Sequence, residues 1–203
     1  MRSDLIQPLK TASLLLILLT LLTGIIYPLF ITAIAQLVFP WQANGSLIKQ
    51  DNKIMGSILI GQSFDAPKYF WGRPSATTPF PYNAANSTGS NLGPSNPDFL
   101  ALVKKRIDYL RQSTPQENIA VPLIPVDLVT ASGSGLDPDI SPLAAFYQIS
   151  RIAKARNVSE KDIEDLIKNL VKPASWGLFG EMRVNVLELN IALDHYQSRK
   201  ESA

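Results

Sequence analysis

Residues 130–142, TASGSGLDPDISP, are the densest group of side chains in the sequence that could take part in chemistry. A phosphate-binding P-loop needs two glycines five positions apart and a lysine directly after the second. Gly133 and Gly135 are too close together, and no lysine follows them. A nucleophile elbow needs the pattern G-x-S-x-G, whereas Ser134 has a glycine directly on each side. The spacing therefore fits neither of these sites.

A serine hydrolase built on Ser132 or Ser134 would also need a general base beside the nucleophile. His195 is the only histidine in the sequence, and it falls at the end of the last predicted helix. The chain contains no cysteine, so a cysteine nucleophile, a disulfide and a thiolate metal site are all excluded. We therefore predict no catalytic residue and expect the chain not to be an enzyme.

Two aspartates of the same stretch could instead hold a cation. Asp137 and Asp139 flank Pro138, and serine or carbonyl oxygens lie nearby in the sequence. A calcium loop of the EF-hand type needs more carboxylates and a closing glutamate. Aspartates in such positions commonly accept hydrogen bonds from backbone amides in turns and at helix starts. The pattern favours that role over a metal site, with Ser141 capping a helix that begins at Pro142.

The side of a membrane on which this stretch lies depends on the N-terminal segment. No charged residue occurs from residue 11 to residue 48, and residues 11–39 are almost entirely apolar. A helix of that length would reach about 43 Å, while the hydrocarbon core of a bilayer needs about 30 Å. The apolar part of a signal peptide is shorter, about 7–15 residues. We predict a short N-terminus over 1–10, an uncleaved transmembrane helix over 11–39 and one domain over 40–203.

The charges around this helix predict its orientation. Arg2 and Lys10 precede it, and no charge follows it until Lys49. The positive-inside rule then places the N-terminus in the cytoplasm and residues 40–203 in the periplasm or its equivalent. Gly24 and Pro28 lie about one turn apart on the predicted helix, where a glycine allows a neighbouring helix to approach closely. The alternative is that both residues are simply common in membrane spans.

The expected fold is a single N-terminal transmembrane helix followed by one exoplasmic α/β (α+β) domain. The formal net charge of +2 is far from that of a nucleic-acid-binding protein, so no nucleic-acid partner is expected. Strands are predicted over 56–64 and 126–130, with a short extended piece over 68–74 and a long loop over 75–97. Helices are predicted to start after Asn96, Ser141 and Ser159, and a last helix to run to about Tyr196.

Four long motifs resemble one known family. They are GQSFDAPKYFWGRPSAT at 61–77, GSNLGPSNP at 89–97, VDLVTASGSGLDPDISP at 126–142 and GEMRVNVLELNIALD at 180–194. In this order they are similar to the C chain of the Kdp potassium-transporting ATPase, and the resemblance covers nearly the whole chain. Two positions depart from the pattern: Asp139 stands where that family has histidine, and Met182 where it has proline.

The resemblance implies an accessory subunit of an ATP-driven, high-affinity potassium importer in the cell membrane. Its implied partners are a channel-like potassium-binding subunit, a P-type ATPase subunit and a small single-span subunit. The family is described as needed for assembly and as a catalytic chaperone that raises the affinity of the ATPase subunit for ATP. ATP is thus expected only through the family, and contact with the domain over 40–203 would conflict with the predicted orientation.

Eight positions are candidates for subunit contacts or for structural roles: Gly24, Pro28, Arg73, Asn91, Ser132, Asp137, Asp139 and Ser141. Two other functions remain open at this point. One is a membrane-anchored hydrolase that uses Ser132 or Ser134, and the other is an anchored domain that senses an ion or a solute.

Overall fold

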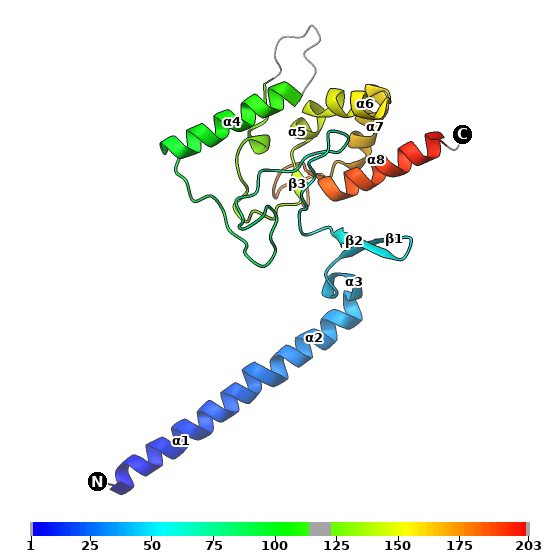
Figure 1. Cartoon of the computed structure of the whole chain (residues 1–203). Coiled ribbons are helices and arrows are strands. Elements are labelled where there is room, and N and C mark those ends of the chain that lie inside the picture. Colours follow the sequence, from blue (N-terminus) through cyan, green and yellow to red (C-terminus); the bar gives the residue numbers. More distant parts are fainter. Residues whose placement is uncertain (1, 114–122, 202–203) are drawn as a thin grey trace. The chain divides into compact units, whose positions relative to one another are not determined.

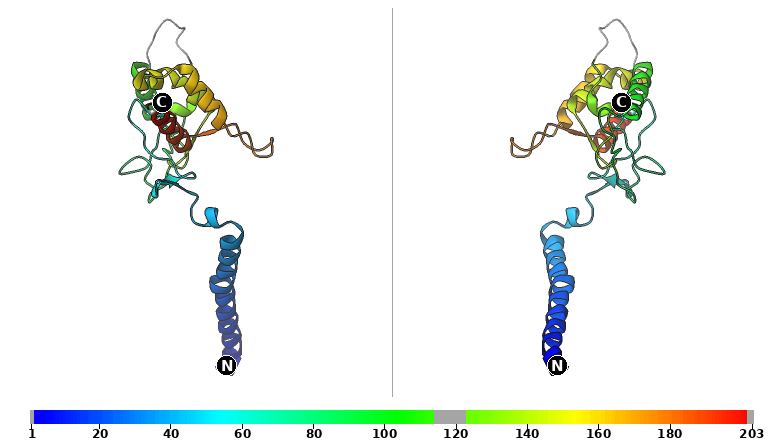
Figure 2. Two further views of the ribbon diagram at one scale, coloured as in Figure 1. Left: turned by 90° about the vertical axis from the view of Figure 1, so that its right-hand side faces the viewer. Right: turned by 90° about the vertical axis from the view of Figure 1, so that its left-hand side faces the viewer.

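The computed structural model describes residues 2–113 and 123–201 (Figure 1). The chain divides into two compact units, Met1–Leu47 and Ile48–Ala203. The helical elements of the first unit are α1 (Arg2–Leu21), the π-helical turn η1 (Leu22–Ile26), α2 (Tyr27–Val38) and the short α3 (Pro40–Ala43). The first three form one continuous helical segment (Figure 1 and Figure 2).

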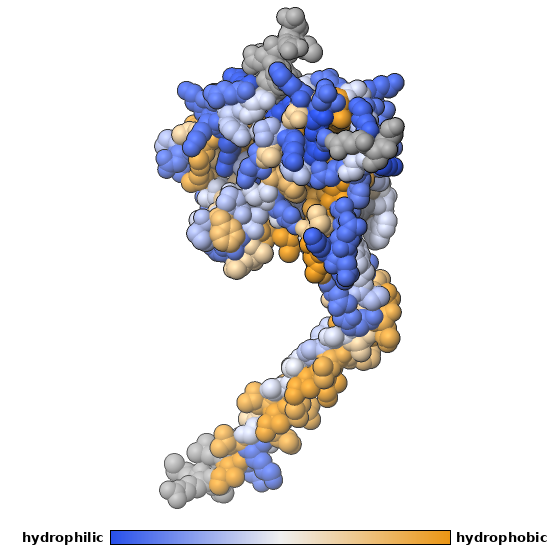
Figure 3. Space-filling view, turned by 45° about the vertical axis from the view of Figure 1, so that its right-hand side comes forward, coloured by the Kyte–Doolittle hydropathy of each residue, from blue (hydrophilic) through white to orange (hydrophobic). Residues whose placement is uncertain are grey.

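This helical segment is long and apolar enough to cross a membrane. The stretch Ile6–Val38 has 33 residues, and it is the one such helix among residues 2–113 and 123–201. Its apolar side chains are exposed, and Figure 3 shows them gathered along the segment. A long apolar helix of the predicted kind is therefore present, and the helical structure begins earlier than residue 11, at Arg2.

The widened turn η1 accommodates Pro28. In a regular α-helix the ring of Pro28 would press against the carbonyl of Gly24, four residues earlier. Here the preceding turn is π-helical, and the N–H of Tyr27 donates to the carbonyl of Leu22, five residues back. The hydroxyls of Thr23 and Thr32 donate to the carbonyls of Leu19 and Pro28, both at 2.7 Å, so neither hydroxyl is left unpaired in a lipid environment.

The second unit combines short strands with a cluster of helices. Strands β1 (Leu47–Gln50) and β2 (Lys53–Ser57) form one two-stranded sheet. Strands β3 (Asp139–Ile140) and β4 (Val184–Asn185) form another and run antiparallel, with Asp139 opposite Asn185 and Ile140 opposite Val184. The helices are α4 (Pro97–Ser113), the 3₁₀ turn η2 (Val126–Leu128), α5 (Pro142–Tyr147), α6 (Ile149–Arg156), α7 (Glu160–Leu170) and α8 (Val186–Glu201).

The hydrophobic core of this unit lies between α5, α6, α7 and α8. Its fully buried side chains include Ile152, Ile163, Ile167, Leu189 and Leu193. Burying one such side chain stabilises a fold by about 1.5–3 kcal/mol. The core also includes Phe70, which comes from an irregular segment far away in the sequence and has no exposed surface. The helical core therefore fixes the position of the segment around residue 70.

Helix starts in this unit follow the predicted caps. The side chain of Asn96 accepts from the N–H of Asp98 at 2.8 Å, at the start of α4. The Ser141 hydroxyl accepts from Ala144 N at 3.0 Å, and the Ser159 hydroxyl accepts from Asp162 N at 3.1 Å. Each cap satisfies one of the backbone donors that a helix start leaves unpaired.

The predicted strands and one helix need correction. The strand predicted over 56–64 lies earlier, at β2, and residues 126–128 form the 3₁₀ turn η2 instead of a strand. The helix after Ser141 breaks at Gln148 into α5 and α6. Leu143 has 72% of its surface exposed, because Ala144 and Ala145 occupy the inner face of the short α5.

Candidate functional site

The stretch 130–142 is fixed in place by the segment 73–75. The Arg73 guanidinium forms an ion pair with Asp137 at 3.0 Å, and it also donates to the carbonyl of Ala131 at 3.4 Å. The N–H of Ser132 donates to the carbonyl of Pro74 at 3.1 Å. The Ser75 hydroxyl donates to the carbonyl of Gly135 at 2.7 Å. These contacts join two of the four motifs and bring Arg73, Ser132 and Asp137 together.

The loop before α4 packs closely on the same stretch. The N–H of Thr88 donates to the carbonyl of Ser134 at 3.0 Å. Gly135 has a φ of +68°, and a Cβ at this position would lie 2.5 Å from Thr77 Cγ2 and 2.7 Å from the carbonyl oxygen of Thr88. Gly135 therefore permits this close backbone contact, whereas a Cβ at Gly133 would meet nothing within 4 Å.

Neither Ser132 nor Ser134 is hydrogen-bonded to His195 among the described residues. Ser132 is 3% exposed, and the Ser134 hydroxyl accepts from the N–H of Leu136 at 3.1 Å. His195 lies on α8. This arrangement lacks the contact between nucleophile and base that a hydrolase needs.

Aspartates and serine at 137–141 organise the backbone, as the sequence indicates. Asp137 accepts from the N–H of Asp139 at 3.1 Å, and Asp127 accepts from the N–H of Ser141 at 2.8 Å. Asp139 forms an ion pair with Arg183 at 3.3 Å. Burial raises the pKa of the Asp139 carboxyl, the charge of Asp137 raises it further, and Arg183 opposes both effects. The described residues include no group of three or more His, Cys, Asp or Glu side chains that could hold a metal ion.

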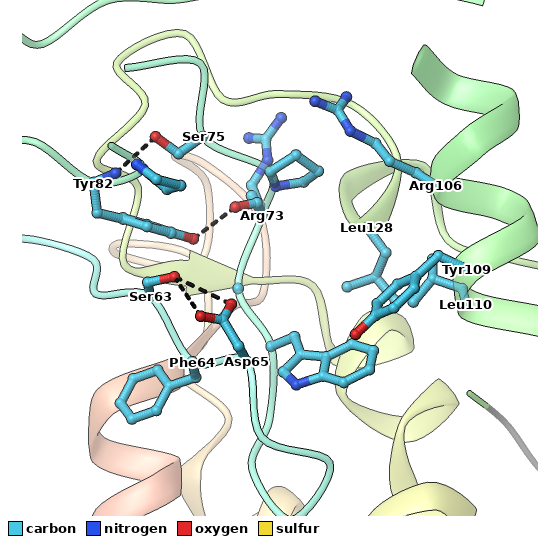
Figure 4. Close-up of a pocket in the computed structure, with 14 residues that line it drawn as sticks. Ser63, Phe64, Asp65, Arg73, Ser75, Tyr82, Arg106, Tyr109, Leu110 and Leu128 are labelled. Carbon is cyan, nitrogen blue, oxygen red and sulfur yellow. Dashed lines mark hydrogen bonds between the residues drawn. The ribbon is translucent and has the colours of Figure 1, made fainter. Parts of the chain in front are cut away.

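A pocket of about 310 Å³ opens beside the segment 73–75 (Figure 4). Trp71 and Tyr109 stack there with their ring centres 5.3 Å apart. Arg106 reaches the pocket from α4 and donates to the carbonyl of Val129 at 2.8 Å, and burial lowers its pKa. The other lining residues are Ser63, Phe64, Asp65, Gly72, Arg73, Pro74, Ser75, Pro81, Tyr82, Leu110 and Leu128.

The lining of the pocket brings guanidinium, hydroxyl and aromatic groups close together. Burial raises the pKa of Tyr82 to about 12, and its hydroxyl donates to the carbonyl of Arg73 at 2.6 Å. The Arg73 Nε atom is buried and has no hydrogen-bond partner among the residues that the structure describes. The lining of the pocket combines two guanidinium groups with aromatic rings, and the described residues in it include no histidine, cysteine or lysine. Such a lining can hold a planar or anionic group, and within it the Ser63 hydroxyl donates to the Asp65 carboxylate at 3.2 and 3.4 Å (Figure 4).

Two buried amide side chains position the pocket, and sequence reasoning missed both. Gln148 accepts from the N–H of Trp71 at 2.8 Å and donates to its carbonyl at 3.1 Å. Asn190 makes the same pair of bonds with Phe70, at 2.8 and 3.0 Å. The two side chains replace the neighbouring strand that an extended segment normally needs. The available signal was a polar residue at a core-facing position of α8 and at the α5–α6 junction.

Arg151 contacts the segment around Trp71 through its guanidinium group. Its guanidinium lies 3.6 Å from the centre of the Trp71 ring and donates to Gln148 at 2.6 Å and to the carbonyl of Tyr69 at 3.0 Å. It also donates to the carbonyl of Pro67. Burial lowers the pKa of Arg151 to about 10, so it remains charged at neutral pH.

The remaining candidate positions lie apart from this pocket. Asn91 is exposed and has a φ of 53°, a left-handed conformation that asparagine tolerates. Gly24 and Pro28 belong to the helical segment of the first unit. A Cβ added at Gly24 would meet nothing within 4 Å, so the isolated chain does not itself require a glycine there.

Comparison with known proteins decides the family. The family model described as "K+-transporting ATPase, c chain" matches residues 9–195, which include most of the helical segment and most of the second unit. The chain belongs to the KdpC family. The resemblance of the four motifs is thereby confirmed.

Curated KdpC relatives match over almost their whole length. A protein of Methylococcus capsulatus is 56% identical over 185 residues, covering 91% of this chain and 96% of the relative. One of Dechloromonas aromatica is 54% identical over 186 residues, covering 92% and 96%. One of Burkholderia orbicola is 55% identical over 194 residues, covering 96% and 97%. Each is named a potassium-transporting ATPase KdpC subunit.

Proposed function

We propose that this KdpC-family chain is a non-catalytic accessory subunit of an ATP-driven potassium importer, needed for assembly of the complex. The observation that carries the proposal is the family match over residues 9–195, with relatives that are named as subunits of a potassium-transporting ATPase. The structure supports the non-catalytic role, because the polar groups of the stretch 130–142 are used in hydrogen bonds that hold the backbone of this stretch and its neighbours in place. Neither Ser132 nor Ser134 contacts His195 among the described residues.

The proposed partners are the channel-like potassium-binding subunit, the P-type ATPase subunit and a small single-span subunit. Gly24 supports helix packing in the membrane, because open space surrounds the position that its Cβ would take. Close helix contact through small residues is a common basis of association in lipid. The helical segment thus offers one surface for assembly, and the second unit offers another.

An effect on ATP affinity belongs to the same proposal and acts through subunit contacts. The proposed orientation places the N-terminus in the cytoplasm and residues 40–203 outside, because Arg2 and Lys10 precede the helical segment. ATP is on the cytoplasmic side. The chain then changes the conformation of the ATPase subunit from the other face of the membrane and does not itself bind the nucleotide.

Co-purification tests this function most directly. The full chain, produced together with the two large subunits, is purified in detergent through an affinity tag on this chain. We expect both large subunits to be recovered with it, and we expect a complex without this chain to lose potassium-dependent ATP hydrolysis. Failure of the wild-type chain to recover either large subunit would overturn the proposal.

A further inference from the structure

The segment between α7 and α8 projects from the second unit as a loop that we call the apolar loop, residues 173–182 (Figure 2). At its base Lys172 and Arg183 exchange backbone hydrogen bonds of 2.8 and 3.0 Å. Near its tip Ser175 and Phe179 do the same, at 2.8 and 3.0 Å. The loop therefore has a defined shape that rests on its own backbone bonds.

The tip of the apolar loop presents large apolar side chains to solvent. Trp176 is 90% exposed and Leu178 is 84% exposed. Phe179 and Met182 are also exposed, and the rings of Trp176 and Phe179 meet edge to face with centres 6.1 Å apart. Each large aromatic side chain can bury about 150–250 Å². The exposed apolar area of the tip is thus comparable with that of the largest apolar patch on a typical monomer, and such a patch often has a function.

The backbone at the tip is held in an uncommon conformation. Trp176 has a φ of 54°, in the left-handed region, which is strained for a bulky residue. This conformation directs the indole ring into solvent, where it buries almost no surface and so adds little to the stability of the folded second unit. A preordered loop loses little conformational entropy when it binds. The strain and the exposure together point to a binding partner.

Charge distinguishes between a protein partner and a bilayer. Residues 173–182 contain one charged residue, Glu181, which is exposed and forms no ion pair among the described residues. The two cations at the base are engaged, Lys172 with Glu188 and Arg183 with Asp139. Segments that bind an anionic membrane surface carry free lysines and arginines beside their apolar residues. The one charge of the apolar loop is negative, so the loop is better suited to a protein partner than to an anionic membrane surface.

We infer that the apolar loop inserts Trp176 and Leu178 into an apolar pocket of another subunit of the complex, with a cationic group at the pocket rim facing Glu181. This inference rests on the proposed function, since it assigns one contact surface of the proposed accessory subunit. Exposed aromatic anchors that fill a partner's pocket commonly dominate the binding free energy of an interface.

The first experiment identifies what the tip touches. A photo-crosslinking amino acid replaces Leu178 in the full chain, which is produced with the other subunits and illuminated in membranes. We expect a cross-linked product that joins this chain to one other subunit. The matched control places the same group at Leu143, an exposed leucine on α5, where a weaker product or none is expected. Products containing only lipid, or only a second copy of this chain, would overturn the inference.

The second experiment measures the contribution of the anchor. Trp176→Ser should weaken the association with the other subunits by about tenfold or more in detergent, while Leu143→Ser leaves it unchanged. The thermal unfolding of the Trp176→Ser chain alone should equal that of the wild type, because the side chain is exposed there. If Trp176→Ser associates as strongly as the wild type, this inference fails and the proposed function stands. If the wild type does not associate, the proposed function itself fails.

Discussion

Asp139 carries a charge that its surroundings disfavour. The carboxyl is part of β3, and burial outweighs the attraction of Arg183, so its pKa lies above the ordinary carboxyl value. A carboxyl whose pKa is raised in the folded state binds more protons there than in the unfolded state. The free energy of unfolding therefore falls as the pH rises through this pKa, and at neutral pH the ionised group destabilises the fold.

Replacing Asp139 by asparagine should remove this cost. Asp139→Asn keeps the shape of the side chain and carries no charge, so we expect it to unfold at the same or a higher temperature than the wild type at pH 7. The gain should not exceed about 2–4 °C, the shift that about 1 kcal/mol causes in a domain of this size. The difference should shrink as the pH is lowered through the raised pKa. A clear loss of stability at pH 7 would show that the ion pair with Arg183 outweighs burial.

At the scale of elements, Gln148 joins the helical core to the pocket. Gln148 lies between α5 and α6, and its side chain makes the two backbone bonds that hold Trp71 extended. Gln148→Leu removes both bonds and leaves buried donors and acceptors unpaired. Each such group costs about 1–3 kcal/mol, so we expect a loss of at least that size in the free energy of unfolding. Chemical denaturation of the full chain in detergent measures it.

The matched control for this substitution is Gln112→Leu, which changes an exposed glutamine on α4. We expect its free energy of unfolding to stay within about 0.5 kcal/mol of the wild type. Equal stabilities of the two variants would mean that the bonds from Gln148 to Trp71 do not hold the segment in place.

The helical segment gives a second prediction at this scale. Gly24→Leu should fit the isolated chain, because a Cβ at that position meets nothing within 4 Å. The larger side chain should nevertheless keep a neighbouring helix at a distance and reduce the recovery of the large subunits in detergent. Leu19→Ala, elsewhere on the segment, should have a smaller effect. Equal recovery of both variants would mean that the segment is only an anchor.

Local patterns predict helix starts and spans better than they predict strands. The caps at Asn96, Ser141 and Ser159 are confirmed, because each depends on residues within four positions of it. The extended segment at 70–71 depends on Gln148 and Asn190, which are more than seventy residues away. For the same reason sequence alone indicated Arg73 but not the pocket that it lines, since Arg106 and Tyr109 come from α4.

At the scale of the whole molecule, the side of the membrane decides what each unit can contact. The orientation remains a prediction from Arg2 and Lys10. A reporter fused after Ala203 that is active only outside the cytoplasm should be active, while one that is active only in the cytoplasm should be silent. The reverse pattern would place the second unit beside ATP, and direct nucleotide contact would then agree with the topology.

The three tryptophans of the chain differ in their access to water. Trp71 is 9% exposed and lies over a guanidinium, Trp41 is 47% exposed, and Trp176 is 90% exposed. Indole emits at longer wavelengths in water than in an apolar environment, so the red edge of the intrinsic fluorescence belongs mainly to Trp176. The protein thus carries a native optical label at the tip of the apolar loop. A blue shift on adding another subunit would report the burial of that tip in real time, without any introduced dye.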